Sequence, residues 1–228
     1  MAFVVAIDGP AGSGKGTITK AVGKRMNLTN IDTGAMYRCT ALYMIRNNIG
    51  LEDTEKIKEM LETINIDMIQ RDEGDIFYLN GEDVSKLIRE KDVSAFVSPV
   101  SHVPEIRKAM SGLQRKMGLT KDVIMEGRDI GTNVFPDADV KIYLDATPEE
   151  RARRRFKQNQ EKGINMTYEE VLESIIARDN NDRTSDVAPL RQAEDAVYLD
   201  STNLTIEEVT QKVVDIINEK KGMKNGNN

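Results

Sequence analysis

The residues with the clearest chemical meaning stand near the start of the chain, directly after the apolar run at residues 3–7. They form a glycine-rich loop between an expected buried strand and an expected helix. Such a loop points several backbone N–H groups at one anion, and the helix N-terminus adds partial positive charge. A lysine in the loop can reach the outer phosphates of a nucleotide. The segment therefore predicts a phosphate-binding loop (P-loop) for a nucleoside triphosphate, made of Gly9, Pro10, Ala11, Gly12, Ser13, Gly14, Lys15, Gly16 and Thr17.

One position of this loop is unusual. Gly16 stands where a Ser or Thr is usual, and the hydroxyl comes one residue later, at Thr17. The alternative to a P-loop is an ordinary glycine-rich turn that contains a lysine by chance. The expected strand before the segment and the expected helix after it argue against this alternative. The displaced hydroxyl leaves two ways for Thr17 to serve Mg²⁺, by direct ligation or through a water molecule.

A second motif, Asp-Thr-Gly-Ala-Met-Tyr-Arg at residues 32–38, follows another short apolar piece and opens a helix. Arg38 could clamp a phosphate of an acceptor with two hydrogen bonds, and Thr33 could add a donor. The alternative is a capped amphipathic helix in which Tyr37 only packs against the core.

A third motif, Glu-Gly-Arg-Asp-Ile-Gly-Thr at residues 126–132, follows the apolar run 123–125. Ligands of α/β folds bind at the carboxyl ends of sheet strands, which is where Glu126 is expected. Its carboxylate could hold Mg²⁺ through water, and Arg128 could neutralise phosphate. The alternatives are a capping or turn residue for Glu126 and a surface pair for Arg128 and Asp129.

Two further groups of charges lie on expected helices. Arg151, Arg153, Arg154 and Arg155 are either a solvated helix face or the arginines of a mobile lid that closes over a phosphoryl group. Arg178 and Asp182 lie four residues apart and would share one face if their helix continues. They are either an exposed ion pair or groups that bind the acceptor.

Composition limits the alternatives. The chain has 228 residues and a formal net charge of −6, which argues against general nucleic-acid binding. It has no apolar run long enough for a membrane span and no secretory signal pattern at its start. With Cys39 as its single cysteine it can form no internal disulfide, and a cytoplasmic location is expected.

Apolar runs alternate with longer amphipathic segments, which predicts an α/β fold with a parallel sheet flanked by helices. The expected strands are residues 3–7, 28–31, 123–125, 140–144 and 196–199. The expected helices are residues 15–26, 35–47, 104–117, 148–161, 168–179 and 206–220.

One segment breaks this rhythm. Residues 63–90 contain interleaved polar and apolar residues and the tight-turn pair Asn80-Gly81, which predicts a small antiparallel β insert. We expect one kinase domain over residues 1–221, with this insert as an acceptor-binding element, a helical lid at about 148–166, and a disordered tail at 222–228.

Taken together, the ordered motifs resemble those of the bacterial cytidylate kinases, which are P-loop nucleoside monophosphate kinases. The resemblance spans residues 2–217 and includes the P-loop, the motifs at 32–38 and 126–132, Val-Phe-Pro-Asp-Ala, Lys-Ile-Tyr-Leu-Asp-Ala, the Arg-Asp-x-x-Asp helix end and Val-Ala-Pro-Leu. It implies a Mg²⁺-dependent cytoplasmic monomer that transfers the γ-phosphoryl group of ATP to CMP or dCMP. The acidic charge and the lack of a long apolar run predict no nucleic-acid or membrane partner.

The motifs and this resemblance together assign roles to single residues. We expect Lys15, Arg128, Arg178 and either Arg154 or Arg155 to be catalytic, and Thr17 and Glu126 to serve the metal. The implied CMP site comprises Thr33, Tyr37, Arg38, Ser98, Arg107, Arg128, Asp129, Arg178 and Asp182. The chain departs from the family at Ser185, where an arginine is usual, so its phosphate clamp is either weaker there or supplied by Arg191.

An acceptor phosphate needs no strong general base, because catalysis then consists of positioning and charge neutralisation. A kinase for UMP, AMP or a metabolite hydroxyl remains an alternative, and Asp32 could act as base for a hydroxyl. A nucleotide-dependent switch is the non-enzymatic alternative, but the chain lacks the guanine-reading sequence Asn-Lys-x-Asp.

Overall fold

The structure is a computed structural model that describes residues 2–71, 74–161 and 163–225. The chain divides into two compact units. One unit combines Met1–Ile31 with Gly118–Asn228, and we call it the P-loop unit. The other comprises Asp32–Met117, and we call it the insert unit.

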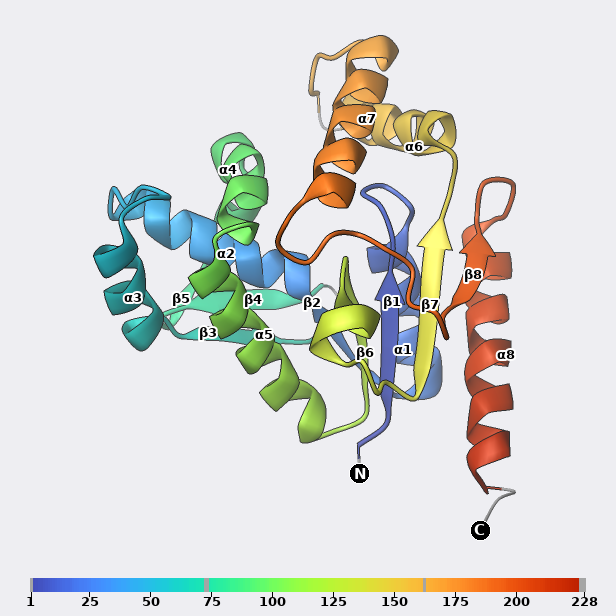
Figure 1. Ribbon diagram of the computed structural model, residues 1–228. Helices are drawn as coiled ribbons and strands as arrows, with labels where there is room; N and C mark the ends of the chain where they lie inside the picture. Colours follow the sequence, from blue (N-terminus) through green and yellow to red (C-terminus); the bar gives the residue numbers. More distant parts are fainter. Residues whose placement is uncertain (1, 72–73, 162, 226–228) are drawn as a thin grey trace. The chain divides into compact units, whose positions relative to one another are not determined.

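A five-stranded sheet forms the centre of the P-loop unit, with the strand order β2-β6-β1-β7-β8 (Figure 1). Val5 on β1 lies opposite Ile124 on β6 and Val140 on β7, and these pairings are parallel. The predicted parallel sheet is therefore confirmed. Its strands are β1 (Val4–Asp8), β2 (Thr29–Asp32), β6 (Val123–Gly127), β7 (Val140–Asp145) and β8 (Val197–Asp200).

Two helices cover one face of this sheet. Helix α1 (Lys15–Met26) has the predicted bounds, and α8 (Ile206–Asn225) packs beside it. Ile18 of α1 and Val213 of α8 share one buried apolar cluster with Ile7 of β1. This packing holds β1 and α1, the two elements on either side of the P-loop, in place. Helix α8 includes residues 222–225, so the expectation of a disordered tail is wrong there. Residues 226–228 lie outside the described part of the chain.

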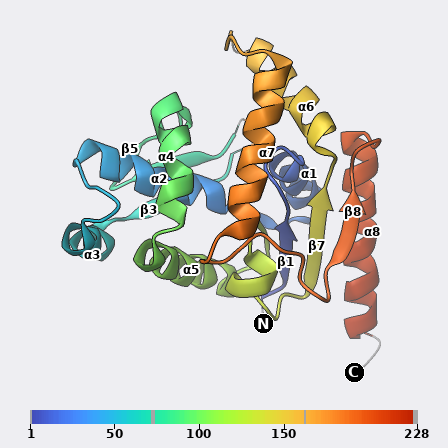
Figure 2. The ribbon, with the colours of Figure 1, turned by 45° about the horizontal axis from the view of Figure 1, so that its top comes forward.

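Helices α6 (Pro148–Glu161) and α7 (Tyr168–Thr184) form a hairpin that follows β7 (Figure 2). Ala152 of α6 packs with Val171 and Ile175 of α7, and the rings of Phe156 and Tyr168 meet edge to face. Helix α7 runs five residues beyond its predicted end at residue 179. Among the residues that the structure describes, no helix combines the length and apolarity required to span a membrane.

The insert unit contains the predicted antiparallel sheet, with the order β3-β4-β5. Asn80 and Gly81 both have positive φ angles, 50° and 85°, and form the tight turn between β4 and β5. The elements of the unit are α2 (Thr33–Arg46), α3 (Thr54–Thr63), β3 (Ile66–Ile69), β4 (Ile76–Leu79), β5 (Glu82–Asp83), the 3₁₀ turn η1 (Leu87–Arg89), α4 (Lys91–Ser101) and α5 (Pro104–Leu119, whose last two residues belong to the P-loop unit).

Candidate active site

The P-loop joins the end of β1 to the start of α1. Gly12 and Gly14 have left-handed φ angles of 80° and 94°, and Gly14 is the N-cap of α1. Left-handed residues that alternate with ordinary ones turn successive N–H groups toward a common point, where they can bind an anion. The structure thus places the predicted residues 9–17 in a loop that suits phosphate.

Gly9 has no room for a side chain. Its φ is 153°, and a Cβ atom there would lie 2.0 Å from the carbonyl oxygen of Leu144 on β7. We expect Gly9→Ala to force β1 and β7 apart at the loop and to lower the free energy of unfolding by more than about 3 kcal/mol. Chemical denaturation measures this effect. Gly74→Ala, at another positive φ but with open space around it, is the control, and equal losses in the two variants would contradict the steric explanation.

Lys15 is the central cation of the loop. Its side chain is buried, and Nζ donates a hydrogen bond of 2.7 Å to the carbonyl oxygen of Pro10. Burial, followed by the positive charge of Arg128, lowers its pKa from 10.5 to about 7, against the opposing effect of Glu126. A bound phosphate would stabilise the ammonium form of Lys15, so the Lys15 amine should gain a proton when a nucleotide binds.

This lowered pKa predicts proton uptake on nucleotide binding. At about pH 8 the free protein carries mostly neutral Lys15, and phosphate binding raises the pKa of Lys15, so the amine takes a proton from solution. Affinity for ATP should therefore fall as pH rises above 7. Calorimetry of ATP binding in buffers of different ionisation enthalpy should give an uptake approaching one proton, which disappears in Lys15→Met. A binding heat that is independent of the buffer would contradict the assignment.

Glu126 and Thr17 supply the oxygen atoms suited to a metal. A Cβ atom on Gly16 would lie 2.9 Å from Oε1 of Glu126, so the carboxylate at the end of β6 reaches the first turn of α1. Thr17 is exposed in the same turn. Among the described residues no three acidic, histidine or cysteine side chains gather as a metal site. Two hard oxygen donors fit Mg²⁺, which keeps several waters and takes its other ligands from nucleotide phosphates.

Arg128 and Asp182 form an ion pair, with Nε of Arg128 2.8 Å from Oδ2 of Asp182. Both Arg128 and Arg178 are close enough for their charges to lower the pKa of Lys15. Arg178 and Asp182 both lie on α7, because this helix continues past residue 179. The structure thus brings Lys15, Arg128, Arg178 and Asp182 into one charged region.

Asp8 and Asp129 support the loop that follows β6. Asp8 accepts hydrogen bonds from the N–H groups of Ile130 (2.8 Å) and Gly131 (2.7 Å), a structural role consistent with its buried position. Burial raises the pKa of Asp8 to about 6. Asp129 is buried, and its Oδ2 accepts a hydrogen bond of 2.9 Å from Asn133.

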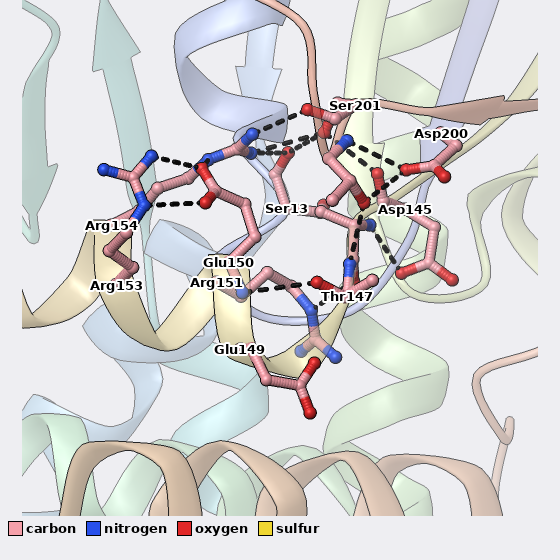
Figure 3. Close-up of polar contacts among 12 residues, drawn as sticks. Ser13, Asp145, Thr147, Glu149, Glu150, Arg151, Arg153, Arg154, Asp200 and Ser201 are labelled. Atoms are coloured by element: carbon pink, nitrogen blue, oxygen red, sulfur yellow. Dashed lines mark hydrogen bonds and ion pairs between the residues drawn. The ribbon is translucent and has the colours of Figure 1, made fainter. Parts of the chain in front are cut away.

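Arg154 lies against the P-loop (Figure 3). Its Nη2 donates to the carbonyl oxygen of Ser201 (2.7 Å), its Nη1 reaches the carbonyl oxygen of Ser13 (3.5 Å), and its Nε pairs with Glu150. Arg153 is exposed and pairs with Glu150 as well. Glu150 is therefore engaged by two arginines, while the hydroxyl of Thr147 caps its N–H group.

The remaining two arginines of α6 differ sharply from each other. Arg155 is exposed. Arg151 is fully buried and forms a two-pronged ion pair with Asp179, with distances of 3.0 Å and 2.6 Å. The interpretation of all four arginines as a lid that closes on phosphate, or as a solvated face, is therefore wrong for Arg151. Sequence spacing gave no signal of this pair, because the partners lie 28 residues apart on different helices.

Five residues of the implied CMP site lie in the insert unit, on α2, α4 and α5. The guanidinium of Arg107 lies over the ring of Tyr37, 5.6 Å from its centroid, and Nη1 of Arg107 donates to the carbonyl oxygen of Ser101. Arg38 donates to the hydroxyl of Ser94 (2.8 Å). Thr33 and Tyr37 are buried on α2, while Ser98 is half-buried on α4.

Two residues for which the sequence leaves alternatives open, Asp32 and Ser185, have clear local roles. Asp32 caps α2 by accepting the N–H of Ala35 (2.9 Å), so its carboxylate is already engaged. Ser185 ends α7, and its hydroxyl accepts the N–H of Val187.

Comparison with known proteins identifies the family. The model of the family described as cytidylate kinase matches residues 5–219. The chain belongs to the cytidylate kinase family. A cytidylate kinase of Fusobacterium nucleatum subsp. nucleatum is 52% identical over 207 residues, which cover 91% of this chain and 93% of that protein. A cytidylate kinase of Carboxydothermus hydrogenoformans is 48% identical, over 95% of this chain and 97% of that protein.

A solved structure of an uncharacterized protein from Eubacterium ventriosum has a similar fold. It shares 11% sequence identity with this cytidylate kinase family member, with a TM-score of 0.55 and coverage of 96% of this chain and 99% of that one. At this identity the likeness concerns the fold alone.

Proposed function

We propose that this chain transfers the γ-phosphoryl group of ATP to CMP or dCMP, which yields ADP and CDP or dCDP. The observation that carries the proposal is the P-loop with its buried lysine, in a chain of the cytidylate kinase family. The loop fits the donor, and the acceptor class comes from the relatives, which are named cytidylate kinases.

On the donor side, the N–H groups of residues 9–17 and the ammonium of Lys15 would bind the β- and γ-phosphates. Thr17 and Glu126 would hold Mg²⁺ through water. When bound with ATP, this ion neutralises part of the phosphate charge. The backbone amides need no reorganisation during transfer, because β1 and α1 already fix them.

On the acceptor side, we propose that CMP contacts Thr33, Tyr37, Arg38, Ser98 and Arg107 of the insert unit, and Arg128, Asp129, Arg178 and Asp182 of the P-loop unit. Arginines suit this task because the planar guanidinium binds phosphate oxygens in pairs. Arg128 would exchange its hydrogen bond with Asp182 for the acceptor phosphate, and Asp182 would then be available to a ribose hydroxyl.

The proposed chemistry needs no general base, since the acceptor phosphate is already an anion. Arg38, Arg128 and Arg178 would orient it in line with the γ-phosphate. Arg154 or Arg155, on the proposed lid at residues 148–166, would neutralise the transferring group. Closure of this lid would also exclude water and limit the hydrolysis of ATP.

A screen of purified protein tests the proposal. ADP formation is followed with ATP and, separately, CMP, dCMP, UMP, AMP or shikimate. CMP or dCMP should support the highest kcat/KM, and ATP alone should give almost no turnover. Slow hydrolysis that no acceptor accelerates would indicate a nucleotide switch instead, and a preference for another acceptor would replace the proposed substrate.

We also propose that the enzyme works as a cytoplasmic monomer in pyrimidine nucleotide metabolism. Its buried cysteine, Cys39, is consistent with a reducing compartment. Sedimentation at assay concentrations checks the oligomeric state, and a stable dimer would overturn that part of the proposal.

A further inference from the structure

Three carbonyl groups of the P-loop accept hydrogen bonds from cationic side chains. The oxygen of Pro10 accepts from Lys15, that of Ala11 from Nη1 of Arg151 (3.1 Å), and that of Ser13 from Arg154. In a planar trans peptide the C=O and the following N–H point in opposite directions. A cation that binds a carbonyl oxygen therefore leaves the next N–H pointing away from that cation.

Arg151 is the most firmly held of these cations. Its side chain is 1% exposed, and Asp179 holds both of its terminal nitrogens. Its Nε donates to the carbonyl oxygen of Ala146 (2.8 Å), just after β7. One guanidinium thus joins β7, α7 and the P-loop, and its burial keeps it away from the transferred phosphoryl group.

Packing supports the same connection. A Cβ atom on Gly12 would lie 3.3 Å from Cβ of Arg151, so the first turns of α6 press directly against the loop. Gly12 itself has the left-handed φ of 80° that the anion-binding conformation requires. The peptide between Ala11 and Gly12 is therefore held from outside by hydrogen bonding and packing together.

We infer that Arg151, oriented by Asp179, is a positioning residue for the phosphate donor: it fixes the Ala11–Gly12 peptide so that the N–H of Gly12 faces the bound phosphates. The inference rests on the proposed binding of ATP at this loop. It separates Arg151 from Arg154 and Arg155, which are the candidates for direct phosphate contact.

Arg151→Lys tests the inference. Lysine keeps the positive charge beside Asp179 but lacks the fork that bonds Asp179, Ala11 and Ala146 at once. We expect the Kd for Mg·ATP, measured by calorimetry, to rise by about tenfold or more, and the Kd for CMP to change less than about twofold. The matched control is Arg153→Lys, an exposed arginine that pairs with Glu150 on the same helix and should leave both constants unchanged.

A selective loss of ATP affinity in Arg151→Lys supports the inference. Unchanged ATP affinity, or an equal loss for ATP and CMP, overturns it. If this variant does not fold, Arg151→Met/Asp179→Leu replaces the whole buried pair with apolar side chains, a change that proteins often tolerate, and the same criteria apply. A wild-type protein that binds no ATP would refute the proposed function, whereas ATP binding that is insensitive to Arg151 refutes only this inference.

Discussion

Lys15→Met is expected to lower kcat by about three orders of magnitude while the protein stays folded. The variant loses the one cation that lies within the P-loop itself, where phosphate charge would develop. Stability should not suffer, because the fold already disfavours the ammonium form. Because burial lowers the pKa of Lys15, this side chain costs stability, and the cost grows as pH falls from 10.5 toward 7. Methionine fills similar space without that cost.

Steady-state assays and thermal unfolding measure the two parts of this prediction. Lys20→Met is the control, since Lys20 is an exposed lysine on the same helix. A Lys15→Met enzyme that keeps nearly the full rate would contradict the role of the loop. A large fall in Tm would show that Lys15 holds the fold together instead.

Arg128→Met is expected to reduce kcat/KM for CMP by about a hundredfold. The variant loses a proposed phosphate ligand and removes the hydrogen bond of 2.8 Å between Nε of Arg128 and Oδ2 of Asp182. A second effect follows from charge: Arg128 helps to lower the pKa of Lys15, so this pKa should rise in the variant. Proton uptake on ATP binding at about pH 8 should then be smaller than in the wild type.

Arg25→Met is the control for this prediction, because it breaks an exposed arginine–glutamate pair, with Glu207, outside the site. Its kinetic constants should match those of the wild type. If Arg128→Met lowered kcat/KM but left proton uptake unchanged, the electrostatic connection between Arg128 and Lys15 would be wrong.

Much of the P-loop unit could be predicted from the sequence, because its signals are local. The apolar run before Gly9 and the glycines around Lys15 identify β1, the loop and α1 without reference to distant residues. Asn80-Gly81 identifies the β4–β5 turn in the same way, since few residues other than asparagine and glycine adopt two consecutive positive φ angles.

Two helices of the insert unit were not predicted. Helix α3 (Thr54–Thr63) is short and highly charged, and it buries only Ile57 and Met60, so few apolar residues mark it in the sequence. Helix α4 (Lys91–Ser101) contains Pro99, which suggests a break. Pro99 is tolerated because it stands in the last turn, two residues before the end of the helix.

The charged partners could not be predicted at all. Arg151 appears in the sequence as one of four similar arginines, but Asp179, which distinguishes it, lies on another helix. Arg128, just after β6, and Asp182, on α7, are likewise 54 residues apart and are brought together by the fold and not by spacing. The sequence identifies charged residues that could act in the site. Which of them pair with each other depends on the tertiary structure.

The stereochemical course of transfer tests the central claim most directly. ATP that is chiral at its γ-phosphorus through oxygen isotopes is reacted with CMP, and the configuration at the β-phosphorus of the resulting CDP is determined. Direct in-line transfer between two nucleotides, held by the loop amides, Lys15 and the arginines, predicts inversion. Retention would require two successive transfers through a phosphorylated protein group and would contradict the account.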